Sequence, residues 1–527
     1  MKKFSVLYLL FLILPAAAAQ DGYPRNSDVD VLHYQFSLAI NDSTDRIEGN
    51  TLIRVKFLKK ASGISFDFTR TDTSGKGMVV TGVSLNGKDI NWKHEKEKLT
   101  ILLDKPAGQN DTLEFGIRYN GIPADGLIIS RNKFGKRTFF ADHWPDRAHN
   151  YLPCIDHPYD KATVDFIITA PDRYSVVANG ALIEESEMPG DTKLTHWSET
   201  VPVATKVMTF GAARFAVRLA GSVKNIPVWS WVFPENRDAG FTDYSVAVKP
   251  LEYYSKIIGD YPYEKLADVQ SKTRYGGMEN AGTIFYSEYS VTGHGRAEGV
   301  IAHEIAHQWF GNCVTEADWD HIWLSEGFAT YLTSLYFESV QGRARLESDM
   351  KSARVKVLKY YDEYPRPVID TATTNLMDLL NVNSYQKGAW VLHMLRHELG
   401  DESFFKGLKL YYSRFRNSNA LTKDFRIAME EVSGRNLDKF FMQWLYTAGQ
   451  PELAIGHKAG KKKGEIEIDI EQKQDHLFEF NLELMIRDAT GQKLKNIPIS
   501  GRVTKIVAEA MNDAVIIPDP NVNLLFR

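Results

Sequence analysis

The chain has 527 residues, of which 43% are hydrophobic and 25% are charged, and these proportions exclude a collagen-like, low-complexity or mostly disordered protein. At roughly 150 residues per domain, the length indicates about three or four domains. Because 63 basic residues stand against 67 acidic ones, for a net charge of −4, nothing indicates a nucleic-acid-binding surface. The two cysteines, Cys154 and Cys313, exclude a disulfide scaffold and permit one bridge at most, although lone cysteines are more often buried thiols.

Residues 1–19 have the pattern of an export signal. Two lysines precede an apolar run from Phe4 to Leu14, and three alanines, residues 17–19, fit the small residues of a cleavage site. The run is shorter than the roughly 18 apolar residues that span a bilayer, so we expect a cleaved signal peptide, with an uncleaved anchor as the alternative. No later segment has the pattern of a membrane span. We therefore expect an exported protein, periplasmic or secreted, and the near absence of cysteine favours the periplasm.

The spacing of apolar residues divides the rest of the chain into three parts. From about residue 27 to 215, apolar and polar residues alternate, as in strands with one buried face. Between about 240 and 447 the period becomes that of amphipathic helices, and alternation returns after Pro451. We expect a multidomain α+β protein with a signal peptide at 1–19, an N-terminal all-β domain at 20–215, a mainly helical domain at 216–449 and a small C-terminal β-sandwich at 450–527.

A metal-binding pattern occurs in the helical part, at His303-Glu304-Ile305-Ala306-His307. Residues four apart lie one turn apart on one helix face, so both imidazoles can bind a single Zn²⁺. Glu304 can then act as a base on the attacking water without binding the metal. After 18 intervening residues, Glu326 lies at the start of a second predicted helix and is the candidate third ligand. The fourth position stays open, as catalysis requires, and we expect one zinc ion per chain.

The motif has a simpler interpretation, and the sequence contains a second histidine pair with the same spacing. The motif could belong to a helix whose two histidines are only hydrogen-bonded, because short motifs also occur by chance. A second pair, His393 and His397, has the same spacing, but Met394 occupies the position of the base and no third ligand is evident. We expect this second pair to be structural.

Four blocks of sequence resemble the gluzincin zinc aminopeptidases, the family of aminopeptidase N and of leukotriene-hydrolase-type metallopeptidases. The resemblance extends from about residue 27 to the end of the chain. It implies a β domain, a thermolysin-like catalytic domain and a β-sandwich, in a short form without the C-terminal helical domain of larger relatives. The active-site cleft would then be open, or covered by a second subunit of a homo-oligomer. The blocks are Gly276-Gly277-Met278-Glu279-Asn280, His303 to Asn312, Trp323 to Tyr331, and Tyr385-Gln386-Lys387-Gly388.

The resemblance implies a role for each block. Glu279 would bind the free α-ammonium of a peptide, and the segment from Gly276 to Asn280 would bind the peptide main chain. Tyr385 would donate a hydrogen bond to the developing oxyanion, because a phenol stays protonated at neutral pH. The chain would thus be a zinc-dependent aminopeptidase acting on peptides with a free N-terminus. The alternatives are an endopeptidase or dipeptide-releasing peptidase on the same scaffold, and a catalytically inactive peptide-binding relative.

One position departs from the family pattern. Members of the family usually place a Gln or Glu nine residues before a Pro-Cys pair, as a second contact to the amine. Here the same count before Pro153-Cys154 gives Trp144. Asp142 lies close by and could replace the missing contact after a small shift. The second amine contact, and with it strict exopeptidase action, stays open.

Overall fold

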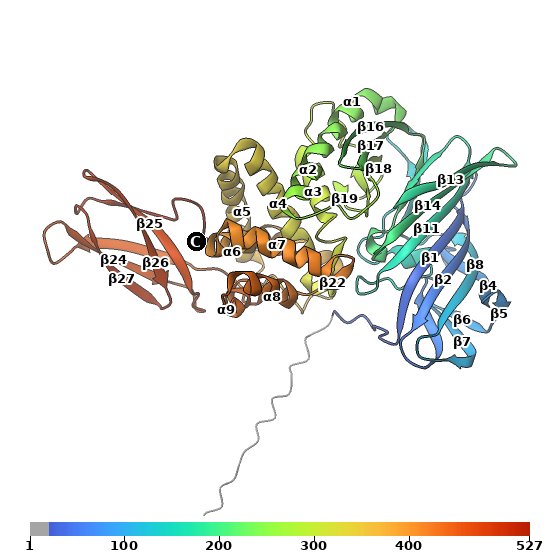
Figure 1. Ribbon diagram of the computed structural model, residues 1–527, viewed down its shortest axis with the longest axis horizontal. Helices are drawn as coiled ribbons and strands as arrows, with labels where there is room; N and C mark the ends of the chain where they lie inside the picture. The colour runs from blue at the N-terminus through green and yellow to red at the C-terminus, as the bar shows by residue number, and fades with distance from the viewer. Residues whose placement is uncertain (1–20) are drawn as a thin grey trace, which may run out of the picture.

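The computed structural model describes residues 21–527, so the predicted signal peptide lies outside the described residues. A β-rich N-terminal part, a helical middle part and a C-terminal pair of sheets follow one another along an elongated molecule (Figure 1). This arrangement confirms the expected multidomain α+β fold, while the individual domain boundaries stay a prediction. Among the described residues, no helix combines the length and the apolar character needed to cross a membrane.

The N-terminal part is built around an eight-stranded sheet of order β13-β14-β11-β1-β2-β8-β4-β5. Along its central strands β1, β2 and β11, buried residues alternate with more exposed ones, as the sequence predicts; on β2, for example, Ile53, Val55 and Phe57 are fully buried. The strands of this sheet are β1 (Val29–Ala39), β2 (Ile47–Phe57), β4 (Gly77–Leu85), β5 (Lys88–Asp89), β8 (Thr112–Ile122), β11 (Ala162–Pro171), β13 (Ala181–Met188) and β14 (Thr192–Val203).

Two smaller sheets accompany the large one. One has the order β12-β15-β10-β9 and the other β3-β7-β6. The loop that leaves β10 runs toward the helical part and carries Trp144. The strands are β3 (Ala61–Asp67), β6 (Trp92–Glu95), β7 (Lys98–Ala107), β9 (Leu127–Arg131), β10 (Arg137–Ala141), β12 (Ser175–Ala178) and β15 (Phe210–Ala213).

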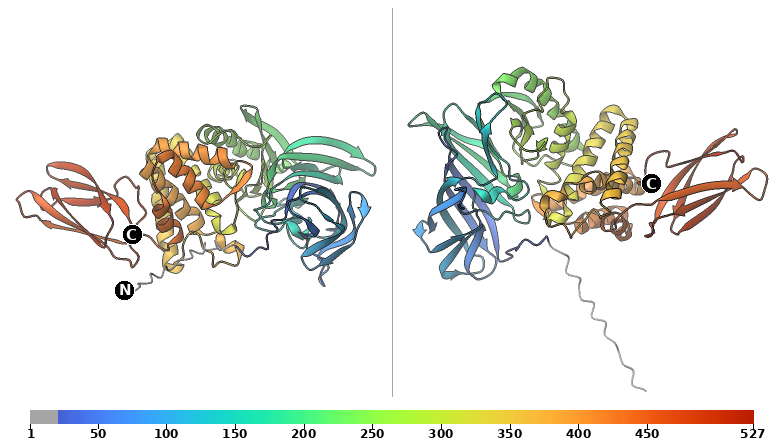
Figure 2. Two further views of the ribbon diagram at one scale, coloured as in Figure 1. Left: turned by 60° about the horizontal axis from the view of Figure 1, so that its bottom comes forward. Right: turned by 180° about the vertical axis from the view of Figure 1, so that it is seen from behind.

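The middle part begins with a five-stranded sheet of order β16-β17-β18-β20-β19 and continues as helices. Two further views show these helices between the two β-rich ends of the molecule (Figure 2). Their apolar faces meet around fully buried tryptophans such as Trp309, Trp323 and Trp390. The elements are β16 (Ala216–Val223), β17 (Ile226–Val232), α1 (Arg237–Tyr244), α2 (Val248–Ile257), β18 (Leu266–Ser271), β19 (Gly277–Met278), β20 (Thr283–Ser287), α3 (Glu298–His307), β21 (Val314–Glu316), α4 (Trp323–Gln341), α5 (Arg343–Glu363), η7 (Asn383–Lys387), α6 (Gly388–Leu399), α7 (Asp401–Phe415), β22 (Ser418–Ala420), α8 (Thr422–Ser433) and α9 (Asp438–Phe441).

The N-terminal part is fixed to the middle part by buried polar contacts. Lys206 forms an ion pair with Glu316 in which both side chains are almost completely buried. Lys161 Nζ donates to the carbonyl oxygens of Asn312 and Cys313, at 2.9 and 2.8 Å, just beyond the end of α3. These contacts hold the loop that follows β10 beside the helices. Cys313 and Cys154 are both buried free thiols, so the bridge that the sequence permits does not form.

The C-terminal part consists of two three-stranded sheets, of order β23-β24-β27 and β26-β25-β28. The alternating isoleucines of β24 are buried, as are Leu482, Leu484 and Ile486 of β25, as expected for the two inner faces of a sandwich. The strands are β23 (Leu453–Ala459), β24 (Glu465–Gln472), β25 (Phe480–Asp488), β26 (Gly491–Ile499), β27 (Val503–Glu509) and β28 (Val515–Pro518).

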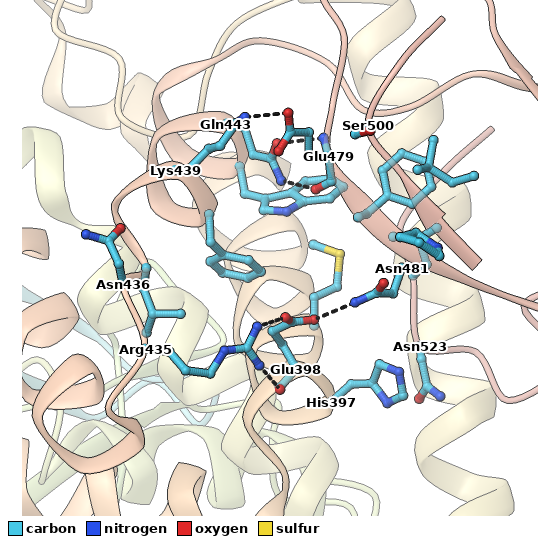
Figure 3. Close-up of a pocket in the computed structure, with 18 residues that line it drawn as sticks. His397, Glu398, Arg435, Asn436, Lys439, Gln443, Glu479, Asn481, Ser500 and Asn523 are labelled. Carbon is cyan, nitrogen blue, oxygen red and sulfur yellow. Dashed lines mark hydrogen bonds and ion pairs between the residues drawn. The ribbon is translucent and has the colours of Figure 1, made fainter. Parts of the chain in front are cut away.

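A cavity of about 340 Å³ lies where the sandwich meets the helices (Figure 3). Gln443 exchanges two hydrogen bonds with the main chain of Glu479, at 2.7 and 3.0 Å. Lys439 forms an ion pair with the Glu479 carboxylate, and Arg435 forms one with Glu398. Because its charged side chains are paired with one another, this cavity is best described as a joint between the two parts.

Candidate active site

Helices α3 and α4 bring together three candidate metal ligands. His303 and His307 lie one turn apart on α3, and their Nε2 atoms are 3.1 Å apart. Glu326, in the first turn of α4, places Oε2 at 3.4 Å from His303 Nε2 and 3.3 Å from His307 Nε2. Ligands at about 2.0–2.1 Å from a tetrahedral Zn²⁺ are separated by about 3.3 Å, so the three donor atoms match that geometry. Glu326 Oε2 is buried and has no hydrogen-bond partner among residues 21–527, as expected of an atom that binds a cation.

Residues around the three ligands fix the orientation of the His307 ring and determine the charge of the site. His307 Nδ1 lies 3.0 Å from Ser325 Oγ and 3.3 Å from the carbonyl oxygen of Phe310, which leaves Nε2 to face the other ligands. Although burial acts to lower it, the carboxylates of Glu326 and Glu279 raise the pKa of His307 to about 9. The site therefore has a negative potential that favours a cation.

The turn between α3 and α4 depends on a glycine. Gly311 has φ +122°, and a Cβ at this position would lie 2.3 Å from Ser325 Oγ and 3.0 Å from His307 Nδ1. Only glycine combines this backbone conformation with such a close approach. Gly311 thus lets the segment after α3 pack closely against Ser325 at the start of α4, next to Glu326.

Glu304, the predicted base, points from α3 toward β19. It is 6% exposed, and a Cβ on Gly277 would lie only 2.3 Å from its Oε1 atom. Burial raises the pKa of the Glu304 carboxyl well above its usual range, and the Glu279 and Glu326 carboxylates raise it further while His307 opposes the rise. A carboxylate with a raised pKa accepts a proton more readily at neutral pH, which suits a general base.

Tyr385, the predicted oxyanion donor, lies on η7, a π-helical turn. Its ring is parallel to that of His303, with centroids 6.0 Å apart and an interplanar angle of 11°. Directly after η7, the first residue of α6, Gly388, meets Gly327 of α4 main chain to main chain, and a Cβ on one would lie 3.0 Å from the Cα of the other. Burial, followed by the Glu326 carboxylate, raises the pKa of Tyr385 well above its usual value, so the phenol stays a hydrogen-bond donor.

Glu279, the predicted amine anchor, directly follows β19 and is 5% exposed. Its carbonyl oxygen accepts hydrogen bonds from Gln308 Nε2 at 2.8 Å and Asn312 Nδ2 at 2.6 Å. Its carboxylate Oε1 is buried without a partner in the described part of the chain. The main chain of Glu279 is therefore fixed while its carboxylate is free for a ligand. The sequence assigned no role to Gln308 and Asn312, although both lie inside the block that carries the motif.

These groups surround one cavity of about 280 Å³. Of the predicted substrate-binding segment, Gly276, Gly277, Met278 and Glu279 line the cavity, whereas Asn280 is fully buried and lies outside its lining. Several apolar lining residues could not be predicted from sequence, because they come from separate loops and helices. The complete lining consists of Trp144, Tyr275, Gly276, Gly277, Met278, Glu279, Val300, His303, Glu304, His307, Glu326, Leu380 and Tyr385.

Asp142 does not serve as the second amine contact that the sequence left open. It is fully buried and lies outside the cavity lining. Its Oδ1 accepts a hydrogen bond from Arg147 at 2.7 Å, and its Oδ2 accepts one from the main-chain N–H of Arg274 at 3.1 Å. The carboxylate is thus already engaged, and Trp144 occupies the expected position at the cavity itself.

The second histidine pair is structural, as expected. His393 is buried, with Nδ1 3.1 Å from the Tyr331 hydroxyl and Nε2 2.8 Å from the carbonyl oxygen of Val522. His397 lines the cavity at the joint with the β-sandwich, where its Nε2 lies 3.9 Å from Oε1 of Glu483. Among the described residues, the one group of three or more candidate metal ligands is His303, His307 and Glu326.

Comparison with known families gives two matches. A model described as the peptidase M1 N-terminal domain matches residues 31–207, and one described as the peptidase family M1 domain matches residues 243–444. The two matches together cover most strands of the N-terminal part and all the candidate site residues of the helical part.

Comparison with individual proteins gives aminopeptidases and a metallopeptidase. The chain is 28% identical to "Probable aminopeptidase 2" of Sulfurisphaera tokodaii over 420 residues. This aligned region covers 76% of this chain and 52% of that protein. It is 29% identical over 363 residues to the glutamyl aminopeptidase of Homo sapiens, which covers 65% of this chain and 38% of that protein. The chain thus spans about half, or less, of the length of these relatives. The crystal structure of an M1 zinc metallopeptidase from Deinococcus radiodurans is similar, with a TM-score of 0.70 at 25% identity over 82% of this chain and 97% of that chain.

Proposed function

The chain belongs to peptidase family M1, and from this premise we propose that it is a zinc-dependent aminopeptidase that hydrolyses the N-terminal residue of peptides. One observation carries the proposal. A single cavity holds a His-His-Glu donor set, the base Glu304 and the unpartnered carboxylate of Glu279. The names of the relatives, "Probable aminopeptidase 2" and glutamyl aminopeptidase, support the same activity.

Each group has a defined task in this reaction. A zinc ion bound by the donor set would polarise the scissile carbonyl and make water a stronger acid. Glu304 accepts a proton from the attacking water and passes it to the leaving amine. Tyr385 donates a hydrogen bond to the developing oxyanion. Glu279 binds the α-ammonium, which sets the register so that the first peptide bond lies at the reacting groups.

The main chain of the substrate also has a partner. β19 is the last strand of the five-stranded sheet, and it pairs with β20 on one side only. Within residues 21–527 its other edge has no strand partner, which leaves it available to pair with an extended peptide. Because Gly277 has no side chain, the Glu304 carboxylate lies against this strand where a Cβ would be, so the base stands beside the strand that would pair with the peptide.

The proposal is tested with aminoacyl-coumarin substrates, before and after removal of metal with a chelator. We expect about one zinc ion per chain and activity that disappears with the metal and returns when zinc is added. Turnover by a protein stripped of zinc, or its absence from the zinc-loaded protein, would contradict the proposal. No turnover by the zinc-loaded protein would favour the alternative that the chain is a catalytically inactive peptide-binding relative.

A second candidate, an endopeptidase or dipeptide-releasing peptidase, has one observation in its favour. Trp144 occupies the position of a second amine contact, so the preference for a free N-terminus rests on Glu279. A peptide and its N-acetylated form separate the two candidates. We expect the acetylated peptide to be resistant, whereas equal cleavage of both would identify an endopeptidase.

We further propose that the protein is exported, to the periplasm or outside the cell, after cleavage behind Ala19. The lysines and the apolar run of residues 1–19 support this proposal. N-terminal sequencing of the protein from an exported fraction is expected to begin at Gln20. A homo-oligomer in which a second subunit covers the cleft stays a prediction, which sedimentation analysis can test.

A further inference from the structure

One side of the active-site cavity is an aromatic wall built from two parts of the chain. Trp144 comes from the loop after β10, and Tyr275 from the segment before β19. Their rings meet edge to face, with centroids 6.1 Å apart and an interplanar angle of 84°. Trp319 supports Trp144 from another side, with centroids 5.6 Å apart. Since Trp144 is only 2% exposed, its ring has little freedom to move.

The rest of the lining is apolar, apart from the groups already assigned to metal, base, amine and oxyanion. Met278, Val300 and Leu380 complete it, and no lysine or arginine is among the described residues that line the cavity. An acidic substrate side chain would therefore meet carboxylates without a compensating cation. A large apolar or aromatic side chain, in contrast, would exchange water for contact with the wall.

A buried polar network holds the wall in place. Arg147 Nη2 donates to Asp142 Oδ1 at 2.7 Å and to the Tyr275 hydroxyl at 3.2 Å. Asp142 Oδ2 in turn accepts hydrogen bonds from the main-chain N–H of Arg274, at 3.1 Å, and from the Thr273 hydroxyl, at 3.3 Å. The N-terminal part thus fixes the residues that directly precede the amine-binding segment. Because Arg147 is paired with Asp142, it is not free to receive an acidic substrate.

We propose that Trp144 and Tyr275 select a large apolar or aromatic residue at the substrate's N-terminus, and that Asp142 and Arg147 are positioning residues that hold Tyr275. This inference rests on the proposed aminopeptidase function. It assigns to Trp144 a contact with the first side chain of the substrate, in place of a polar contact with its amine.

The first experiment compares kcat/KM for Phe-, Leu-, Ala- and Glu-coumarin substrates with the zinc-loaded protein. We expect Phe and Leu to exceed Ala by at least about 10-fold and Glu by about 100-fold. If no substrate is cleaved, the proposed function itself fails. If the substrates are cleaved but Glu equals or exceeds Leu, the function stands and the inference is wrong.

The second experiment compares Trp144→Ala with Trp92→Ala, a matched change at a tryptophan that is 37% exposed on β6. We expect Trp144→Ala to lower the ratio of kcat/KM for Phe over Ala by roughly 10-fold or more. The Trp92→Ala protein is expected to keep the wild-type ratio. A loss of equal proportion for all substrates in the Trp144 variant would indicate a structural role only and would overturn the inference.

The third experiment tests the positioning network with Asp142→Asn, and with Asp89→Asn as a control at an exposed aspartate. We expect Asp142→Asn to raise KM for the Phe substrate several-fold more than it lowers kcat, because the wall is loosened while the reacting groups remain. If this variant does not fold, Tyr275→Phe removes only the hydroxyl that Arg147 contacts and should shift KM in the same direction. An unchanged KM for Phe in a folded variant would refute the positioning role.

Discussion

Gly277→Ala is expected to lower kcat strongly while the protein keeps its fold and its zinc. A methyl group at this position would lie 2.3 Å from Oε1, 2.5 Å from Cδ and 2.6 Å from Cγ of Glu304. Non-bonded heavy atoms are normally about 3.5 Å apart, so the Glu304 carboxylate must move by about 1 Å. His303 and His307 lie on the same helix as Glu304, and Glu326 lies on α4; none of these three metal ligands is among the three atoms nearest to the new methyl group.

The size of the effect follows from the displacement. A misplacement of about 1 Å in a catalytic group can cost about 100-fold in rate. We therefore expect kcat to fall by about 100-fold, which corresponds to about 2.7 kcal/mol of transition-state stabilisation. Gly276→Ala is the matched comparison, because a Cβ at Gly276 would meet no atom within 4 Å.

The assay measures kcat and KM of both variants with the best aminoacyl-coumarin substrate, together with zinc content and thermal midpoint. Gly277→Ala should retain zinc and a near-normal midpoint and lose turnover, and Gly276→Ala should lose much less. Similar kcat values for the two variants would refute the reasoning that Gly277 leaves room for Glu304. Loss of zinc from the Gly277 variant would show that the displacement reaches the metal ligands instead.

Three further predictions concern single side chains. Glu304→Gln should keep about one zinc per chain and reduce kcat by roughly 1,000-fold, since it removes the proton acceptor; near-normal turnover would contradict the base assignment. Glu279→Ala should lower kcat/KM for free-amine substrates by about 100-fold, and unchanged kinetics would remove its role as anchor. The Asp156 carboxylate, 2.8 Å from His149 Nδ1, raises the pKa of His149 from 6.5 to about 9 against the effect of burial. The stabilisation from this pair is thus complete below about pH 6.5 and is lost as the pH rises through about 9. The urea midpoint should therefore fall between these pH values in the wild type but not in His149→Gln. An equal fall of the urea midpoint with pH in both proteins would exclude the pair as the cause.

The local parts of the site were predictable because short-range geometry determines them. His303 and His307 are one helical turn apart, so any α-helix places them on one face. The pairing with Glu326 depends on how α3 and α4 pack. The spacing made Glu326 a candidate third ligand at the start of the next predicted helix, and the family resemblance supported that choice. Cys154 and Cys313 remain buried thiols, as is usual for lone cysteines.

The aromatic wall was not predictable from spacing. Trp144 and Tyr275 are 131 residues apart in the chain, and the packing of the N-terminal part against the helices brings them together. The hydrogen bonds of Asp142 were likewise not predictable from sequence. Its position near the expected amine contact was visible in the sequence, but its engagement by Arg147 and by the main chain of Arg274 was not. Contacts between distant segments decide which carboxylate is free, and periodicity contains no information about them.

The contact between Gly327 and Gly388 makes the position of the proposed reacting groups independent of the side chains that form the aromatic wall of the same cavity. There, backbone lies against backbone, so the spacing between Glu326 and Tyr385 does not depend on the size of any intervening side chain. The wall around Trp144 and Tyr275, in contrast, consists of side chains that can be exchanged singly. If the proposed preference holds, it would therefore be altered by changing the side chains of Trp144 or Tyr275, while Glu326 and Tyr385 keep a main-chain frame that such changes do not touch.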